Sequence, residues 1–299
     1  MSTLANSSSR PLQGALLVLG AGILWGTTGT AQSFSADALS PYWVGALRLL
    51  VAALFFLVYA GLLSGPASLG RQLSELDWRR AIGAGACMAA YNLTFFAGVK
   101  ATGVAIGTAL ALGSGPIWAG LLQLACGARP SAGWWLGTLL AVAGGMLLVL
   151  GRSNDVRSDP LGIALCLAAG LSYAVYALLN KQLVHRSTPA ITTLGVFLVG
   201  AALALPAAGL WAGPLQITVS GWLVVGFLGI ASTGIAYLLF STGLRSISAA
   251  SGVSLALMEP VTAFLLAILV VGERPGLLAY AGLGALLAGL AIVIRTETR

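Results

Sequence analysis

Ten apolar segments follow one another along this chain, separated by mostly short links. Each is about 20 residues long, the length that lets an α-helix cross the hydrocarbon core of a bilayer. A chain built in this way folds as an all-α polytopic membrane protein. We expect helices at residues 12–32, 41–63, 80–99, 102–124, 132–150, 160–180, 189–211, 220–243, 248–271 and 276–294.

The composition excludes a soluble domain. Charged residues make up only 8% of the chain, hydrophobic residues make up 58%, and the mean hydropathy is +0.96, whereas soluble domains carry about 25% charged residues. The 40 glycines suit helices that approach each other closely in lipid. The net charge of +7 comes from basic residues that stand singly between apolar runs, so we expect no nucleic-acid partner.

The distribution of these basic residues predicts the orientation. With the N-terminus in the cytoplasm, ten basic residues lie at cytoplasmic ends and four at external ends, as the positive-inside rule requires. Both termini should therefore be cytoplasmic. The cytoplasmic set is Arg10, Arg71, Arg79, Arg80, Arg129, Lys181, Arg186, Arg245, Arg295 and Arg299, and the external set is Lys100, Arg152, Arg157 and Arg274.

The second half of the chain repeats the first. Gly98-Val99-Lys100 is echoed by Gly243-Leu244-Arg245 (245 minus 100 is 145), and Gly137 and Gly144 have counterparts at the same offset in Gly282 and Gly289. Because each half holds five helices, an odd number, the second half must enter the membrane from the opposite side. We predict two inverted five-helix repeats, at residues 1–152 and 153–299, a design that favours alternating access around a site at mid-membrane.

A ridge of small residues occurs in the fourth helix and again in the ninth, at a spacing of four residues. Such ridges let helices pack closely. They serve either general helix packing or, as we favour because the ridge is duplicated, a meeting of the two helices at the pseudo-twofold axis. The ridges are Gly103, Gly107, Ala111 and Gly115, and Ser248, Gly252, Ala256 and Pro260.

Several short motifs follow this duplicated order: Leu24-Trp25-Gly26-Thr27, then Pro41 with Leu47-Arg48-Leu49-Leu50, then Pro260 followed by Gly272-Glu273-Arg274. Together they resemble the drug/metabolite transporter superfamily, EamA type, over nearly the whole chain. Within it, the ten-helix length and the aromatic residues inside helices look most like bacterial aromatic amino-acid exporters. The resemblance implies a secondary transporter of the bacterial inner membrane, and it alone supplies the substrate class and the direction of transport.

The first half departs from the family pattern at two places. Ala128 stands where the second half has Glu273, and Gly115 precedes Pro116 where Glu259 precedes Pro260. We therefore expect the two halves to differ in function.

Glu259 is the one acidic residue near the middle of an expected helix. A carboxylate at that depth costs about 2.5 to 3.5 kcal/mol on insertion scales. It faces a cavity, is protonated, or pairs with a polar neighbour, and the alternative to a functional role is a packing residue hydrogen-bonded across helices.

Two prolines and one arginine also lie within the expected helices. Pro116 and Pro260 each remove a helical hydrogen bond, which predicts either a broken helix that lines a cavity or a simple packing kink. Arg48 either reaches the external interface with its long side chain or binds a substrate carboxylate.

A set of aromatic and polar residues lies at mid-depth in the expected helices. Each could simply pack against lipid or a neighbouring helix, but tyrosine and asparagine need hydrogen-bond partners there. We predict that they line a central cavity suited to an aromatic or apolar amphipathic solute. With Glu259, the predicted cavity residues are Trp25, Tyr91, Asn92, Phe95, Trp118, Tyr173, Tyr176 and Tyr237.

Enzyme signatures are missing from the sequence. The single His185 lies in an expected loop, no cluster of intramembrane acids could hold a metal, and no P-loop occurs. We therefore expect no metal or cofactor, and partners limited to a small-molecule substrate and the bilayer, with which a monomer is compatible. The leading prediction is an exporter of amino acids, with aromatic or hydrophobic ones favoured, or of related metabolites. The alternative is a drug or organic-cation exporter with Glu259 as proton-exchange site, ahead of a membrane-embedded enzyme.

Overall fold

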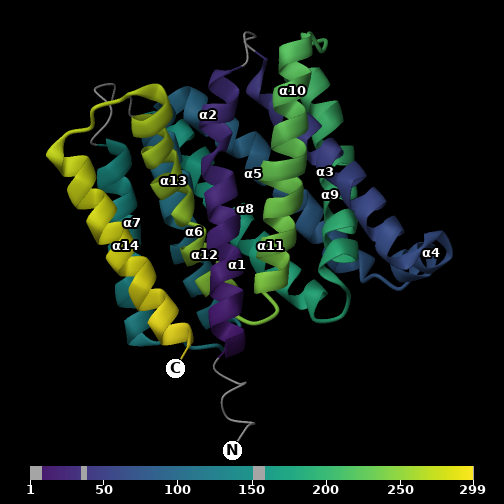
Figure 1. Ribbon diagram of the computed structural model, residues 1–299, viewed down its shortest axis with the longest axis horizontal. Helices are drawn as coiled ribbons and strands as arrows, with labels where there is room; N and C mark the ends of the chain where they lie inside the picture. The colour runs from purple at the N-terminus through teal and green to yellow at the C-terminus, as the bar shows by residue number, and fades with distance from the viewer. Residues whose placement is uncertain (1–8, 35–38, 151–158, 299) are drawn as a thin grey trace, which may run out of the picture.

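The computed structural model describes residues 9–34, 39–150 and 159–298. Within these ranges it contains ten helical spans long and apolar enough to cross a membrane and no strand, which confirms the predicted all-α polytopic fold. Arg152, Arg157 and the predicted boundary between the repeats at residues 152 and 153 lie outside the described residues. Figure 1 shows that α1 begins and α14 ends at the same end of the bundle, which we call the terminal face.

Seven of the described spans are single helices, and three are interrupted. The single helices are α3 (Pro41–Ser64), α5 (Trp78–Thr102), α6 (Val104–Ala125), α7 (Ala132–Leu150), α8 (Pro160–Val184), α9 (Pro189–Ala212) and α14 (Leu277–Glu297). The interrupted spans are α1 (Ser9–Gly26) with α2 (Thr28–Ser33); α10 (Val219–Phe227), the π-helix η1 (Leu228–Ile235) and α11 (Ala236–Gly243); and α12 (Ala249–Leu255), α13 (Met258–Leu266) and the π-helix η2 (Ala267–Val271).

Prolines and capping side chains set several helix starts. Pro41, Pro160 and Pro189 each occupy the first turn of a span, where the missing N–H leaves no helical bond unmade. Before α9, the Thr188 hydroxyl accepts a hydrogen bond from the backbone N–H of Ile191. The sequence therefore marks these boundaries locally.

A short helix that the sequence pattern did not predict occupies the long link after α3. This helix, α4 (Pro66–Ser74), packs Leu69 and Leu73 against the core while Arg71 is exposed. The Trp78 indole N–H donates to the Leu73 carbonyl at 2.9 Å. The link is thus a structured amphipathic turn at the terminal face.

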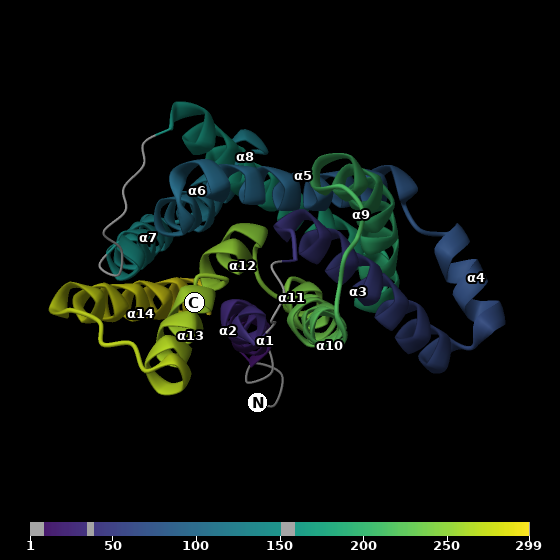
Figure 2. The same ribbon diagram turned by 90° about the horizontal axis from the view of Figure 1, so that it is seen from above.

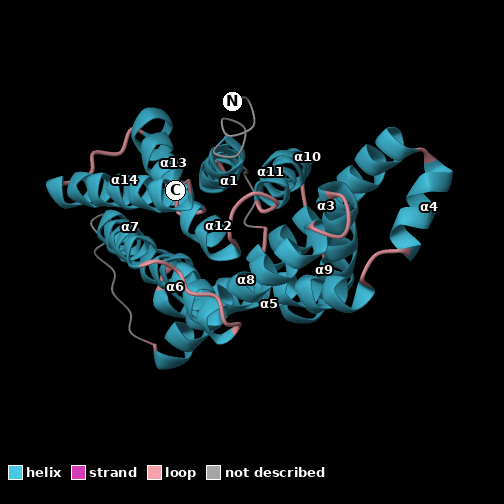
Figure 3. Ribbon diagram, turned by 90° about the horizontal axis from the view of Figure 1, so that it is seen from below, coloured by secondary structure: helices cyan, strands magenta, loops and turns pink. Residues whose placement is uncertain are grey.

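The spans form two rows when the bundle is viewed roughly along the helix axes (Figures 2 and 3). One row contains α5, α6, α7 and α8, and the other contains α1, α11, α12, α13 and α14. Contacts between α7 and α14 join the rows at one end, and α9, which contacts both α5 and α11, joins them at the other end. The first span thus lies among spans of the second half, and the sixth, α8, among spans of the first.

Glycines allow the close contact between α7 and α14. A Cβ atom on Gly144 would lie 2.3 Å from the Leu286 nitrogen, and one on Gly289 would lie 2.4 Å from the Ala141 nitrogen. Both separations are too short for any side chain, so the two backbones touch. The pair is held by close packing along its length.

The first and sixth spans make matching contacts with the other half of the chain. In α1, Cβ positions at Gly14 and Gly22 would lie 2.9 Å from the Gly243 carbonyl and 2.8 Å from the Met258 Cβ. In α8, Gly162 lies equally close to α5, and Gly170 would place a Cβ 2.8 Å from an α6 carbonyl oxygen. Each of these two spans therefore packs on the third and fourth spans of the opposite half.

Candidate functional site

A cavity of about 790 Å³ lies between the two rows of helices. Its lining includes Gln32, Lys100 and Glu273, which stand near span ends at the face opposite the terminal face. The wall combines aromatic rings with a few polar and charged groups, as small-molecule sites do. The aromatic lining residues are Trp25, Tyr91, Phe95, Phe96, Tyr173 and Tyr237, and the other polar ones are Thr28, Arg48, Asn92, Thr108 and Glu259.

Most of the predicted cavity residues meet on this wall, together with four of the predicted ridge residues, one of which is Pro260. Two predicted residues, Tyr176 and Trp118, do not line it. Tyr176 lies one turn below Tyr173 toward the terminal face and is buried, while Trp118 lies further along α6 in the same direction. The predicted residues that line the cavity are Trp25, Tyr91, Asn92, Phe95, Tyr173, Tyr237, Glu259, Ala111, Ala256 and Pro260, with Gly103 at the rim.

A cluster of aromatic rings forms the floor of the cavity. Trp25 packs against Tyr237 with ring centroids 5.0 Å apart and against Phe240 at 5.5 Å. Tyr173 stacks on Tyr176, with centroids 6.0 Å apart, and Tyr176 packs against Phe240. Since Tyr176 and Phe240 are buried, these rings separate the cavity from the terminal face.

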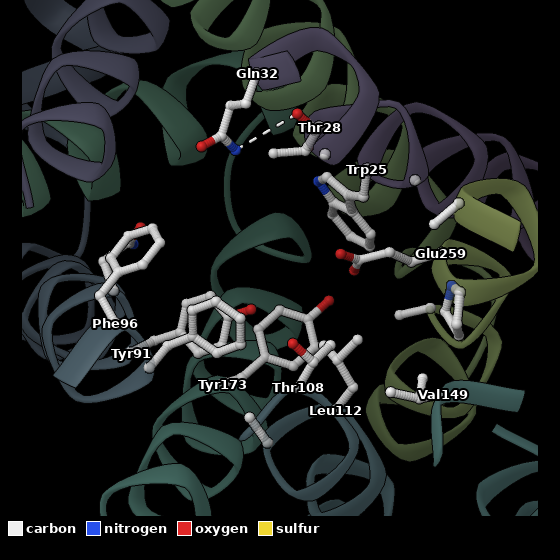
Figure 4. A pocket seen from close by; sticks show the side chains of 18 of the residues that line it. Trp25, Thr28, Gln32, Tyr91, Phe96, Thr108, Leu112, Val149, Tyr173 and Glu259 are labelled. Atoms are coloured by element: carbon white, nitrogen blue, oxygen red, sulfur yellow. Dashed lines mark hydrogen bonds between the residues drawn. The ribbon is translucent and has the colours of Figure 1, made fainter. Parts of the chain in front are cut away.

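Glu259 reaches the cavity because its span is interrupted just before it. The α12 helix ends at Leu255, α13 begins at Met258, and the Ala256 carbonyl accepts from the Glu259 N–H at 2.9 Å, a three-residue step. The carboxylate points into the open space beside the Trp25 ring, opposite Tyr91 and Tyr173 (Figure 4). The acidic side chain is thus part of the cavity wall.

The two prolines predicted to break their helices behave differently. Pro260 lies in the first turn of α13, after the interruption, where proline is tolerated. Pro116 lies inside α6, which continues from Val104 to Ala125 without interruption. The helix is therefore not broken at Pro116, which was one of the two alternatives predicted there, and the break near Pro260 falls three residues earlier than the proline.

Arg48 extends from α3 into the same cavity and is half-buried. Its Nε has no hydrogen-bond partner among the described residues, and neither do the Trp25 indole nitrogen and the Tyr173 hydroxyl on the same wall. Buried polar groups normally have partners, so these three groups are free to bind a solute. The sequence left the role of Arg48 open, and it missed Lys100 and Glu273 on the rim because both lie at span ends.

The predicted ridges mostly pack within their own half. Gly103 and Ser248 precede the first residues of α6 and α12, and a Cβ on Gly107 would lie 2.8 Å from the Val99 Cα of the preceding span. Gly252 packs against Leu244 in the same way. The fourth and ninth spans do contact each other, at Gly115, where a Cβ would lie 3.5 Å from the Val253 Cγ1.

Hydrogen bonds join the two rows near the terminal face. Lys181 on α8 donates to the carbonyl oxygens of Leu244 and Ile247 at 2.9 and 2.7 Å. Thr138 on α7 and Ser254 on α12 bond through their hydroxyls at 3.0 Å. The structure is therefore closed at the terminal face and hollow toward the opposite face.

Comparison with known proteins identifies the family. The EamA-like transporter family matches residues 12–150 and 160–295, nearly all of the chain. The chain belongs to this family. It is a membrane transporter and not an enzyme, as the sequence predicted.

Relatives of this EamA-like transporter are also named as transporters. The uncharacterized transporter YwfM of Bacillus subtilis is 37% identical over 287 residues, which cover 93% of each chain. An uncharacterized transporter of Archaeoglobus fulgidus is 28% identical over 68% of this chain and 71% of its own length. A solved crystal structure at 21% identity superposes with a TM-score of 0.81 over 93% of this chain and 95% of the other, which shows the shared fold.

Proposed function

We propose that this protein is a secondary transporter that exports amino acids with aromatic or hydrophobic side chains, or related metabolites, by alternating access. The carrying observation is the cavity itself: six aromatic side chains and both signs of charge face one space within the membrane spans. Rings of this kind stack on planar apolar groups, while the few polar groups orient the solute.

Matching contacts between the halves support a pair of inverted five-helix repeats. Gly14 and Gly22 of α1 are related to Gly162 and Gly170 of α8 by 148 positions (162 minus 14). Both pairs pack on the third and fourth spans of the opposite half. Repeats interlocked in this way can exchange contacts at one face for equivalent contacts at the other, which is the basis of alternating access.

The orientation follows from charge. Most of the basic residues stand at span ends on the terminal face, and in a bacterial inner membrane such a face is cytoplasmic. The cavity then opens toward the outside, with the cytoplasmic side closed by the aromatic floor and the Lys181 contacts. For an exporter, this is the state that has released its substrate.

Efflux from proteoliposomes tests this function. We expect liposomes that contain the purified protein to release labelled phenylalanine or tryptophan faster than empty liposomes, and unlabelled substrate to compete. Parallel measurements with and without an imposed pH gradient show whether protons drive the transport. The absence of any protein-dependent flux of these amino acids would refute the amino-acid substrate class.

A second candidate, a drug or organic-cation exporter, is favoured by Glu259. Its carboxylate faces the cavity and could alternate between a proton and a cation. That function predicts flux of hydrophobic cations but not of phenylalanine, and loss of proton coupling in Glu259→Gln. Arg48 on the same wall disfavours it, because a fixed positive charge repels a cation.

A further inference from the structure

Four ionisable acidic and basic side chains line the cavity in the described structure, two of each sign. Lys100 and Glu273 stand at the rim, near the ends of their spans, while Arg48 and Glu259 lie within the spans. The formal charge of the inner wall is therefore balanced, with the positive group on α3 and the negative group on α13. A site of this kind favours a solute that carries both charges and has no net charge.

Arg48 and Glu259 face the same cavity without touching. Arg48 lines it from α3 and Glu259 from α13, yet among the described residues no ion pair within 4.0 Å joins them. Tyr91 and Tyr237 line the same space. The two groups thus face a shared volume that can hold the charged part of a solute.

Neither of the two charged groups has a direct partner within the described part of the chain. The Arg48 Nε is buried without a hydrogen bond, and the Glu259 carboxylate points into open space. A charge held at membrane depth without a partner is costly, and a solute that pairs with it removes this cost. A planar guanidinium binds a carboxylate through two parallel hydrogen bonds, and a carboxylate binds an ammonium group.

We propose that Arg48 binds the α-carboxylate and Glu259 the α-ammonium group of a zwitterionic amino acid. The side chain of the solute then lies among the rings of Tyr91, Phe95 and Phe96. This inference rests on the proposed function and adds to it that the site selects by paired charges. A solute that lacks either charge leaves one wall group unpaired.

The test compares three ligands that share a phenyl ring: phenylalanine, phenethylamine and 3-phenylpropionate. Their binding to the purified protein is measured by competition with labelled phenylalanine. For the unaltered protein we expect phenylalanine to bind at least about tenfold more tightly than either single-charge ligand, since each of those ligands loses the hydrogen bonds of one charged group.

Two variants then assign the groups. We expect both variants to bind labelled phenylalanine weakly, so competition with it is unsuitable for them. Binding of the three ligands to each variant is therefore compared by the thermal stabilisation that each ligand gives the protein. In Arg48→Gln, phenylalanine binding falls about tenfold while phenethylamine binding does not fall. In Glu259→Gln, phenylalanine binding falls similarly while 3-phenylpropionate binding does not. The matched controls Arg71→Gln and Glu75→Gln remove the same charges from exposed positions near α4 and should leave all three affinities unchanged.

The outcomes separate the inference from the proposed function. If none of the three ligands binds and no flux of phenylalanine is seen, the proposed function fails. If phenylalanine binds and is transported but single-charge ligands bind equally well, or both variants weaken all ligands alike, only the paired-charge inference is overturned. Should Arg48→Gln not fold, Arg48→Lys keeps the charge without the planar fork, and we expect weaker phenylalanine binding with the same ligand ranking.

Discussion

The fourth spans of the two halves each carry a proline, Pro116 and Pro260, but have different structures. In the first half, α6 runs through Pro116 without a break, and Gly115 lies buried against α8 and α12. In the second half, the chain is interrupted between α12 and α13, and Glu259 enters the cavity. Two spans at equivalent places in the two halves therefore differ in chemistry, since the charged group of the fourth spans that faces the cavity lies in the second half.

The fifth spans of the two halves, α7 and α14, differ from the fourth spans, because both contribute glycines to one close contact. We expect Gly144→Val and Gly289→Val each to destabilise the protein by about 3 kcal/mol or more, because a side chain would displace a backbone. Thermal unfolding in detergent measures the effect. Gly145→Val is the matched control, since a Cβ there lies 3.6 Å from the nearest atom, a Leu286 methyl group. Destabilisation by only one of the first two variants would show that the contact is not symmetric.

Substitution of the two residues before the prolines tests the asymmetry directly. We expect Glu259→Gln to lower phenylalanine flux about tenfold or more, because it removes the charge that faces the cavity. Gly115→Ala should leave the flux within about twofold of the original, since the nearest atom to its Cβ would lie at an ordinary contact distance of 3.5 Å. Flux is measured in proteoliposomes at equal protein content. Equal losses in both variants would mean that the halves contribute alike.

The smallest expected difference in stability is between variants of the N-terminal caps of the third spans of the two halves, Asp77 before α5 and Thr218 before α10. Asp77 accepts a hydrogen bond from the Arg80 backbone N–H at the start of α5, and Thr218 accepts one from Gly221 at the start of α10. The bond from Arg80, aided by the Arg80 and Arg186 side chains, lowers the pKa of Asp77 below its usual 3.8. A lowered pKa means that the ionised form stabilises the folded state above pH about 4, and that this contribution is lost as the pH falls through the lowered value.

Asp77→Asn should therefore be slightly less stable than the original protein at pH 7, and the difference should disappear as the pH falls through the lowered pKa of Asp77. Thr218→Ala should show a loss that does not change with pH, because the hydroxyl does not titrate in this range. Chemical unfolding at a series of pH values measures both. A pH-independent difference for Asp77→Asn would contradict the charge-based cap.

Much of the fold could be predicted because membrane spans are local features of the sequence. Length and apolarity placed all ten spans, and prolines such as Pro41 and Pro160 marked their starts. The interruptions could not be predicted in the same way. The break after Leu255 depends on how α12 and α13 pack against α1, where Gly22 and Gly26 approach Met258 and the Glu259 carbonyl closely.

The candidate site was only partly predictable from the sequence. The position of a residue along a helix follows from the sequence, whereas the side of the helix that faces the cavity does not. Trp25, Tyr91 and Glu259 lie at mid-depth and on the cavity wall, but Trp118, well inside its own span, does not line the cavity. Which way a residue faces depends on tertiary packing, since these helices are apolar on all sides. Arg48 was ambiguous for the same reason.

A structure of the protein with phenylalanine bound tests the central claim most directly. We predict density for one molecule in the cavity between the two rows, with its carboxylate at Arg48, its ammonium group at Glu259 and its ring among Tyr91, Phe95 and Phe96. Phenylalanine bound outside this cavity, or bound within it with neither charged group in contact with Arg48 or Glu259, would contradict the account.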